Sequence, residues 1–134
     1  LYDSVFSVGA IDQFGNMAPF SSRGPVTADG SGRSKPDIVA PGVDIFSSTP
    51  GGGYGFASGT SMAGPHLVGV VALLWSADPS LIGDIDRTEQ LIIETAQPYS
   101  GDTSSGCFEG GMPNAAYGYG MVDVYAAVKD LLDK

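Results

Sequence analysis

Short apolar runs alternate with long polar stretches in the first part of this 134-residue chain. Val5–Ile11 and Asp37–Gly42 are rich in β-branched residues and predict two short buried strands, the second ended by its Pro-Gly pair. Ile45–Thr49 could form a third strand, and Gly51–Gly53 predicts a turn after it. Residues 12–36 are rich in Gly, Pro, Ser, Asp and Asn, and they predict a long loop between the first two strands.

The segment Thr60–Ala77 predicts a long helix with apolar residues on every face. No Asp, Glu, Lys or Arg occurs anywhere from Ile45 to Ala77. Pro65 falls near the predicted first turn, where a missing amide costs little. A helix that is apolar all round belongs in the centre of a domain, so we expect protein to cover this helix on most sides.

Two shorter helices are predicted in the second half of the chain. Asp86, with Glu89 three residues later, is typical of a helix start with Asp86 as the N-cap, and the apolar pattern continues to Ala96. Met121–Leu132 carries apolar residues at helical spacing, after a glycine-rich loop over Ser100–Gly120. Short strands that alternate with helices indicate an α/β layer fold around a parallel sheet.

Composition narrows the classes of partner. The formal net charge of −9 at pH 7 argues against binding to nucleic acid or to an anionic membrane, because both would repel the chain. An acidic surface that aids solubility is the simpler interpretation of this charge. The purely apolar stretch around Leu73–Trp75 is shorter than the roughly 20 residues that a membrane span needs, and no signal peptide is visible.

The candidate chemistry lies in the stretch Ser58–His66. A glycine-rich turn there leads straight into the predicted long helix and places Ser61 at its N-terminus. The first amides of a helix lack internal acceptors, and the helix dipole is positive at that end, so an oxyanion formed beside Ser61 would meet ready donors. Gly59 would let the backbone come close to a substrate carbonyl. The simpler alternative is that Ser61 or Thr60 merely caps the helix.

The motif around this serine carries a family resemblance. Gly59–His66, with the sequence GTSMAGPH, closely resembles the nucleophile motif of the subtilase family of serine proteases, peptidase family S8. Phe20–Pro25, Lys35–Gly42 and Tyr117–Asp123 resemble flanking motifs of the family in the same order. Among subtilases, the chain is most similar to the bacterial enzymes that are like bacillopeptidase F.

The resemblance implies a fold and a domain organisation. Residues 1–134 would form the C-terminal portion of a single subtilase catalytic domain, with a subtilisin-like three-layer α/β fold, a parallel sheet and a buried central nucleophile helix. The catalytic Asp and His of subtilases precede the serine, as does the Asn of their oxyanion hole, and no segment here resembles those motifs. Because Leu1 is not an initiator Met, we expect the chain to begin within the domain.

The resemblance also implies roles for individual residues. Ser61 would be the catalytic nucleophile, and its amide would form half of the oxyanion hole with support from Thr60. Residues 53–58 are expected to form a glycine-rich turn that would border the leaving-group side of the site. The residues adjacent to the substrate would be Ser58, Gly59 and Met62.

His66 is the only histidine of the chain. It lies five residues after Ser61, which on a helix corresponds to about 140° around and about 7.5 Å along the axis. A general base must reach the serine hydroxyl at hydrogen-bond distance, so His66 is not the predicted base, and the resemblance implies a structural role for it. Asp12, Asp37 and Asp44 lack the context of a catalytic carboxylate, and we expect them in turns or at the surface.

The predicted function is part of a serine endopeptidase that hydrolyses peptide bonds through an acyl-enzyme at Ser61. The isolated chain is expected to be inactive, and its expected partners are a peptide or protein substrate and the N-terminal segment of the same catalytic domain. No cofactor is expected for catalysis and no metal-binding residue is predicted, although structural calcium is possible in the parent enzyme, as in many subtilases. The resemblance implies a secreted protein. Cys107 is the single cysteine, so it is either a buried or idle thiol or, in an oxidising environment, paired with a cysteine outside the chain.

Three other interpretations compete with this one. The pattern of Gly59, Ser61 and Ala63 is close to the nucleophile elbow of α/β-hydrolases, but that fold needs a histidine late in the chain, and none follows His66. A non-catalytic binding domain derived from a protease would keep the fold and lack the upstream catalytic residues. A purely structural fragment of a protease is the third alternative.

Overall fold

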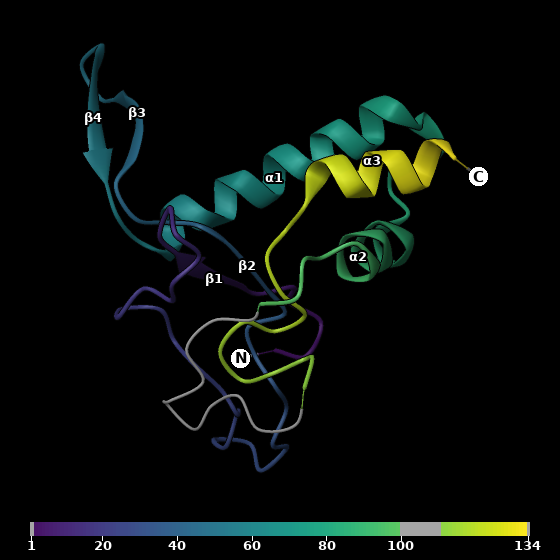
Figure 1. The fold of residues 1–134 in the computed structure, drawn as a ribbon, viewed down its shortest axis with the longest axis horizontal. Helices are drawn as coiled ribbons and strands as arrows, with labels where there is room; N and C mark the ends of the chain where they lie inside the picture. Colours follow the sequence, from purple (N-terminus) through teal and green to yellow (C-terminus); the bar gives the residue numbers. More distant parts are fainter. Residues whose placement is uncertain (1, 100–110, 134) are drawn as a thin grey trace.

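The computed structural model describes residues 2–99 and 111–133. Within these residues, strands come first along the chain and helices follow (Figure 1). The elements are β1 (Val8–Ile11), β2 (Ile38–Pro41), β3 (Ile45–Thr49), β4 (Gly53–Ala57), α1 (Thr60–Ala77), the 3-10 turn η1 (Pro79–Leu81), α2 (Ile85–Glu94) and α3 (Val124–Leu132). Cys107 lies outside the described residues.

β1 and β2 form a parallel pair, as the sequence predicts. Val8 lies opposite Ile38, and the register continues to Ile11 opposite Pro41. The backbone of residues 120–122 adds to the other side of β2, since the Val39 amide donates to the Gly120 carbonyl at 2.9 Å and the Val122 amide to the Val39 carbonyl at 3.0 Å. Ile38, Val39 and Ala40 are fully buried, which explains an apolar run without alternation.

β3 and β4 form an antiparallel hairpin that extends away from the rest of the described chain (Figure 1). Residues 53–58 were expected to be a turn, and that prediction is wrong for most of them, because Gly53–Ala57 is a strand paired with Ile45–Thr49. The turn is shorter and uses Gly51 and Gly52, whose φ angles of 91° and 87° favour glycine. The predicted third strand, β3, is confirmed.

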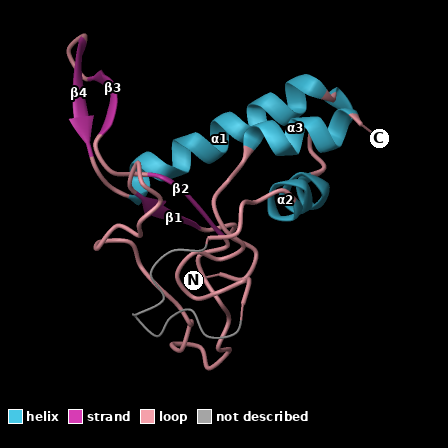
Figure 2. Cartoon of the chain, viewed as in Figure 1, coloured by secondary structure: helices cyan, strands magenta, loops and turns pink. Residues whose placement is uncertain are grey.

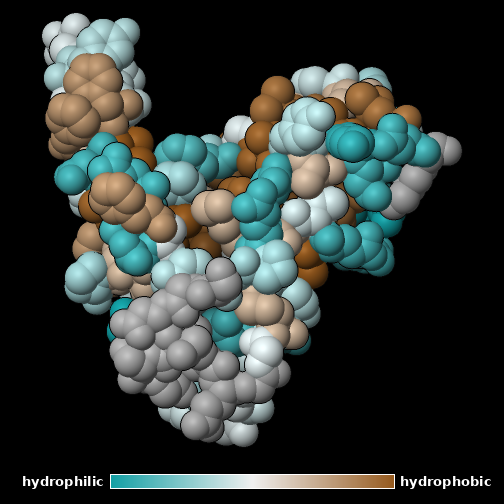
Figure 3. Space-filling model, in the orientation of Figure 1, coloured by the Kyte–Doolittle hydropathy of each residue, from teal (hydrophilic) through white to brown (hydrophobic). Residues whose placement is uncertain are grey.

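α1 lies across β1 and β2 and has α3 beside it (Figures 1 and 2). One face of α1 is buried against the sheet and the neighbouring helices, through Ala63, Leu67, Val70 and Leu74. The expected burial on most sides is not met by the described residues alone, because Val68 and Leu73 are 69% and 54% exposed. Figure 3 shows hydrophobic surface along this helix.

α1 is long and apolar enough to cross a membrane, judged by length and hydropathy alone. The short apolar stretch around Leu73–Trp75 did not predict this. The core helix of a soluble protein passes the same test. α1 packs on two strands, and the side chain of Leu74 is fully buried there, so in this structure it is a core helix with one open side.

The ends of α2 and α3 differ from the predicted ones. The N-cap of α2 is Asp84, whose carboxylate accepts a hydrogen bond from the Arg87 amide at 3.1 Å, whereas Asp86 lies in the first turn. α3 begins only after Asp123, which caps it by accepting from the Ala126 amide at 2.9 Å. Residues 120–122 cannot join this helix because their backbone is paired with β2.

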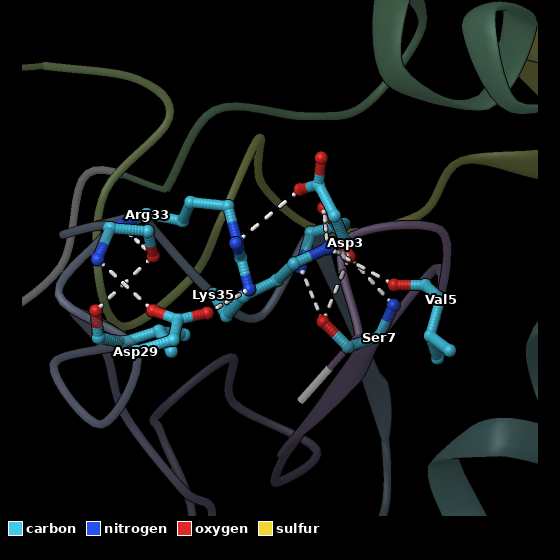
Figure 4. A network of polar contacts seen from close by, with 9 residues as sticks. Asp3, Val5, Ser7, Asp29, Arg33 and Lys35 are labelled. Atoms are coloured by element: carbon cyan, nitrogen blue, oxygen red, sulfur yellow. Dashed lines mark hydrogen bonds and ion pairs between the residues drawn. The ribbon is translucent and has the colours of Figure 1, made fainter.

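Asp37 is not a surface residue, contrary to the sequence-based expectation. Its side chain is 18% exposed and lies 2.7 Å from the ammonium of Lys35, whose side chain is 11% exposed. The same carboxylate accepts from the Ser7 amide at 2.6 Å and the Ser7 hydroxyl at 2.8 Å, and Lys35 also donates to the Val5 carbonyl at 3.0 Å (Figure 4). This cluster ties the segment before β1 to the start of β2. Asp12 begins a turn, since its carbonyl accepts from the Gly15 amide at 3.1 Å, and Asp44 is exposed at the surface, as expected.

Candidate active site

Ser61 is the second residue of α1 and is exposed. The N-cap of this helix is Gly59, and no side chain makes a capping hydrogen bond there. The alternative in which Ser61 or Thr60 serves as the cap is therefore wrong. Neither the Thr60 nor the Ser61 side chain caps the helix. The Ser61 hydroxyl is therefore available for chemistry.

The first amides of α1 fall into two groups. The Met62 and Ala63 amides donate to the Gly59 carbonyl at 3.0 and 3.3 Å. Among residues 2–99 and 111–133, the Thr60 and Ser61 amides have no acceptor. Two open donors at the positive end of an 18-residue helix form a site for negative charge beside the Ser61 hydroxyl.

A close contact between Gly42 and Gly59 fixes the position of this helix end. Gly42 directly follows β2. Its carbonyl accepts a hydrogen bond from the Gly59 amide at 2.8 Å, and its amide donates to the Ile11 carbonyl at 2.9 Å. A Cβ atom at position 42 would lie 2.7 Å from the Cβ of Ala10 and 2.8 Å from the Gly59 carbonyl oxygen. Only glycine allows this approach, and it places the start of α1 at the end of the parallel pair.

Ser58 lies at the base of the hairpin. Its hydroxyl accepts from the Asp44 amide at 2.8 Å and lies 3.3 Å from the Asp44 carboxylate. The hydrogen bonds therefore join the residue before β3 to the residue after β4. The sequence predicted Ser58 beside the substrate, and the structure places its side chain on Asp44, outside the groove that Ser61 lines.

A groove of 410 Å³ separates the hairpin from the first two turns of α1. Ser61, Met62, Pro65 and His66 line one wall. Strand pairing places Ile45 opposite Ala57 and Ser47 opposite Gly55, so these four residues share one face of the hairpin. They line the other wall together with Phe46, Ser48 and Thr49. The groove gives an extended peptide room beside the Ser61 hydroxyl.

His66 lies on the same groove wall as Ser61, and its ring bonds the backbone of its own helix. The His66 side chain is exposed, and its Nδ1 lies 2.9 Å from the Met62 carbonyl one turn earlier. Within the part of the chain that the structure describes, the Ser61 hydroxyl has no hydrogen-bond partner. The same part holds no group of three or more His, Cys, Asp or Glu residues placed to bind a metal ion.

A match to a protein-family model identifies the family to which this chain belongs. The model of the subtilase family, peptidase family S8, matches residues 1–120. The chain belongs to the subtilase family. The predicted family and the α/β fold with a parallel strand pair are thereby confirmed.

Individual subtilases match almost the whole chain. Bacillopeptidase F of Bacillus subtilis is 41% identical over 133 residues, which are 98% of this chain and 9% of that protein. The thermophilic serine proteinase of Bacillus sp. strain AK1 is 38% identical, over 95% of this chain and 26% of the proteinase. The solved structure of the Clostridium perfringens CspB protease superposes with a TM-score of 0.76 at 32% identity, over 98% of this chain and 28% of that one. The chain thus spans less than a third of each of these proteins.

Two features of this subtilase site did not follow from the sequence analysis. The role of Gly42 depends on its contact with Gly59, which lies 17 residues later in the sequence. Neither segment alone indicates that contact. Strand β4 of the hairpin had a signal, because Gly53–Ala57 alternates small residues with Tyr54 and Phe56, as a strand does. The high glycine content of the segment favoured a turn and concealed this alternation.

Proposed function

We propose that this subtilase chain supplies the nucleophile of a serine endopeptidase, and that the nucleophile is the Ser61 hydroxyl. The observation that carries the proposal is the exposed serine at the N-terminus of α1 beside two amides that have no acceptor in the described part of the chain. Such preorganised donors stabilise the charge that develops on a carbonyl oxygen during acyl transfer. Membership of a family of serine proteases supports it.

The reaction proceeds in two steps at this serine. The Ser61 oxygen forms a bond to the scissile carbonyl carbon, a general base takes the hydroxyl proton, and the Ser61 amide donates to the oxyanion with support from Thr60. The amine then leaves with that proton, and an acyl-enzyme remains. Water then attacks the ester carbonyl carbon, the bond to the Ser61 oxygen breaks, the acyl group leaves as a carboxylic acid, and the serine oxygen regains a proton from the general base. Met62 and Gly59 border the substrate, and the groove holds the peptide.

The general base and its carboxylate partner come from outside residues 1–134 in this proposal. His66 is the only histidine, and it hydrogen-bonds its own helix. An N-terminal segment of the same domain is therefore the proposed partner, and the open side of α1 at Val68 and Leu73 is a surface that such a segment would cover. Peptides or proteins are the proposed substrates of the secreted enzyme, with neither nucleic acid nor a membrane as partner. Structural calcium in the parent enzyme is part of the proposal, and catalysis itself needs no cofactor.

Ser61→Ala in the full protein that contains this chain tests the proposal. Peptide hydrolysis should fall by about 10⁶-fold, the size of the loss known for the nucleophile of subtilisin, while the melting temperature stays nearly unchanged. Ser76→Ala is the matched control, because Ser76 is an exposed serine of the same helix that bonds the Ala72 carbonyl. The control should retain activity. Hydrolysis that survives Ser61→Ala would refute the proposed nucleophile.

A further inference from the structure

A second cavity, which Ser61 does not line, lies between the turn after β1 and the base of the hairpin. Its volume is 400 Å³. Residues from both segments form its walls, and the groove beside Ser61 shares only Ile45 with it. The residues that the inference uses are Asp12, Phe14, Asp44 and Phe56.

The walls of this cavity combine aromatic rings with carboxylates. Phe14 and Phe56 are 78% and 72% exposed, which is unusual for phenylalanine. Asp12 and Asp44 add two acidic groups, and no Lys, Arg or His among the described residues lines the cavity. An aromatic ring attracts a cation through its face, and a carboxylate attracts it by charge. Together they suit a guanidinium or ammonium group on an apolar stem.

Asp12 carries a negative charge at neutral pH. Burial alone would raise the pKa of Asp12, but hydrogen bonds from Asn16 and from the Phe14 and Gly15 amides together outweigh it and lower the pKa below its ordinary value. Asp12 accepts from the Phe14 and Asn16 amides at 2.8 and 2.9 Å. These bonds also hold the backbone of Phe14 next to the carboxylate.

The cavity is close to the nucleophile along the chain and in space. The Asp44 amide donates to the Ser58 hydroxyl at 2.8 Å, and Ser58 precedes Ser61 by three residues. Three extended residues span at most about 11 Å. In an extended substrate, a residue about three to five positions from the scissile bond is far enough from Ser61 to span this separation.

We propose that the cavity binds a basic side chain of the polypeptide substrate, an arginine or lysine about three to five residues from the scissile bond. The proposal rests on the proposed function, because it assigns a substrate preference to the same cleavage. The rings of Phe14 and Phe56 contact the aliphatic stem of the basic residue. The carboxylates of Asp12 and Asp44 neutralise its charge, and the net charge of −9 favours the approach of such substrates.

The test compares peptides that carry arginine or its neutral isostere citrulline at one position at a time, on both sides of the scissile bond. With the full protein, we expect kcat/KM to be about tenfold higher for arginine at one of these positions. The ratio should fall toward one in Asp44→Asn and in Phe56→Ala. Asn tolerates the φ of 52° at position 44 and keeps an acceptor for Ser58, so this change removes only the charge.

Tyr54→Ala is the matched control, because Tyr54 is 73% exposed on the hairpin face of Phe56 but does not line the cavity. It should leave the arginine-to-citrulline ratio unchanged. A ratio near one at every position in the wild-type protein contradicts the proposal. A lower melting temperature with an unchanged ratio in Asp44→Asn and Phe56→Ala also contradicts it, and would show that another segment of the protein covers the cavity.

Failure of the proposed function gives a different result. In that case no peptide is cleaved, and the cavity is tested by the affinity of the full Ser61→Ala protein for the arginine and citrulline peptides. A preference of about tenfold for arginine that Asp44→Asn removes would support the cavity alone. Equal affinities would overturn it.

Discussion

At the scale of the residue, the chemistry of Ser61 depends on backbone groups more than on side chains. The Gly59 carbonyl takes the Met62 and Ala63 amides, and the amides of Thr60 and Ser61 stay open in the described part of the chain. Gly59 in turn is held by the hydrogen bond that its amide donates to the Gly42 carbonyl. The position of the open amides is therefore set by a contact between two glycines.

Gly42→Ala should disturb this contact. The new Cβ would lie 2.7 Å from the Cβ of Ala10 and 2.8 Å from the Gly59 carbonyl, so one of the two segments must move. We expect a loss of about 1–3 kcal/mol in the free energy of unfolding, as for other overpacked cores. We also expect kcat to fall by about 10–100-fold, because the amides beside Ser61 shift with Gly59. Gly42→Ser should cost more in both measurements.

Urea unfolding and peptide hydrolysis by the full protein measure the two effects. If Gly42→Ala folds with unchanged kcat and unchanged stability, the Gly42–Gly59 contact does not position the nucleophile. If stability falls while kcat is unchanged, the contact is structural only.

At the scale of the element, continuous apolar runs were the easiest to predict. β1, β2 and α1 follow from such runs, although β1 begins at Val8 and not at Val5, because the segment Val5–Ser7 is held by Lys35 and Asp37 instead of by strand pairing. The helix that carries Ser61 and the position of the serine in it could both be predicted from the motif. The groove and the hairpin depend on tertiary packing, which a single segment does not encode.

α2 contains an acidic residue whose charge opposes folding. Burial, followed by the charges of Asp37 and Asp86, raises the pKa of Glu89 above its ordinary value. A raised carboxyl pKa favours the protonated form in the folded state, so its stabilising effect is present below the unfolded pKa of about 4.3 and is lost as the pH rises through the folded value. Glu89→Gln should therefore raise the melting temperature at pH 7, and the gain should shrink as the pH falls below about 4.

Thermal unfolding of the full protein as a function of pH checks this prediction. Glu94→Gln is the control, because Glu94 is exposed at the end of the same helix and its carboxylate bonds Gln90. The control should not reproduce the pH-dependent gain. A gain that is the same at pH 3 and pH 7, or a loss at pH 7, would contradict the effect of burial on Glu89.

At the scale of the whole molecule, the described residues leave apolar surface in water. Val68 and Leu73 on α1 are 69% and 54% exposed. A fully buried side chain of this size contributes about 1.5–3 kcal/mol relative to an exposed one, and a domain has only about 5–15 kcal/mol of net stability. The chain also spans less than a third of the subtilases that it matches. Under the proposed function, residues outside this chain both cover α1 and supply a base for Ser61.

Labelling with a fluorophosphonate, followed by peptide mapping, tests this central claim most directly. In the full protein, we expect one equivalent of label on Ser61, because an activated serine attacks the phosphorus and the open amides receive the oxyanion. In the isolated 134-residue chain, we expect no label above background, since an unactivated serine is a weak nucleophile. Stoichiometric labelling of Ser61 in the isolated chain, or labelling of a different serine in the full protein, would contradict the account.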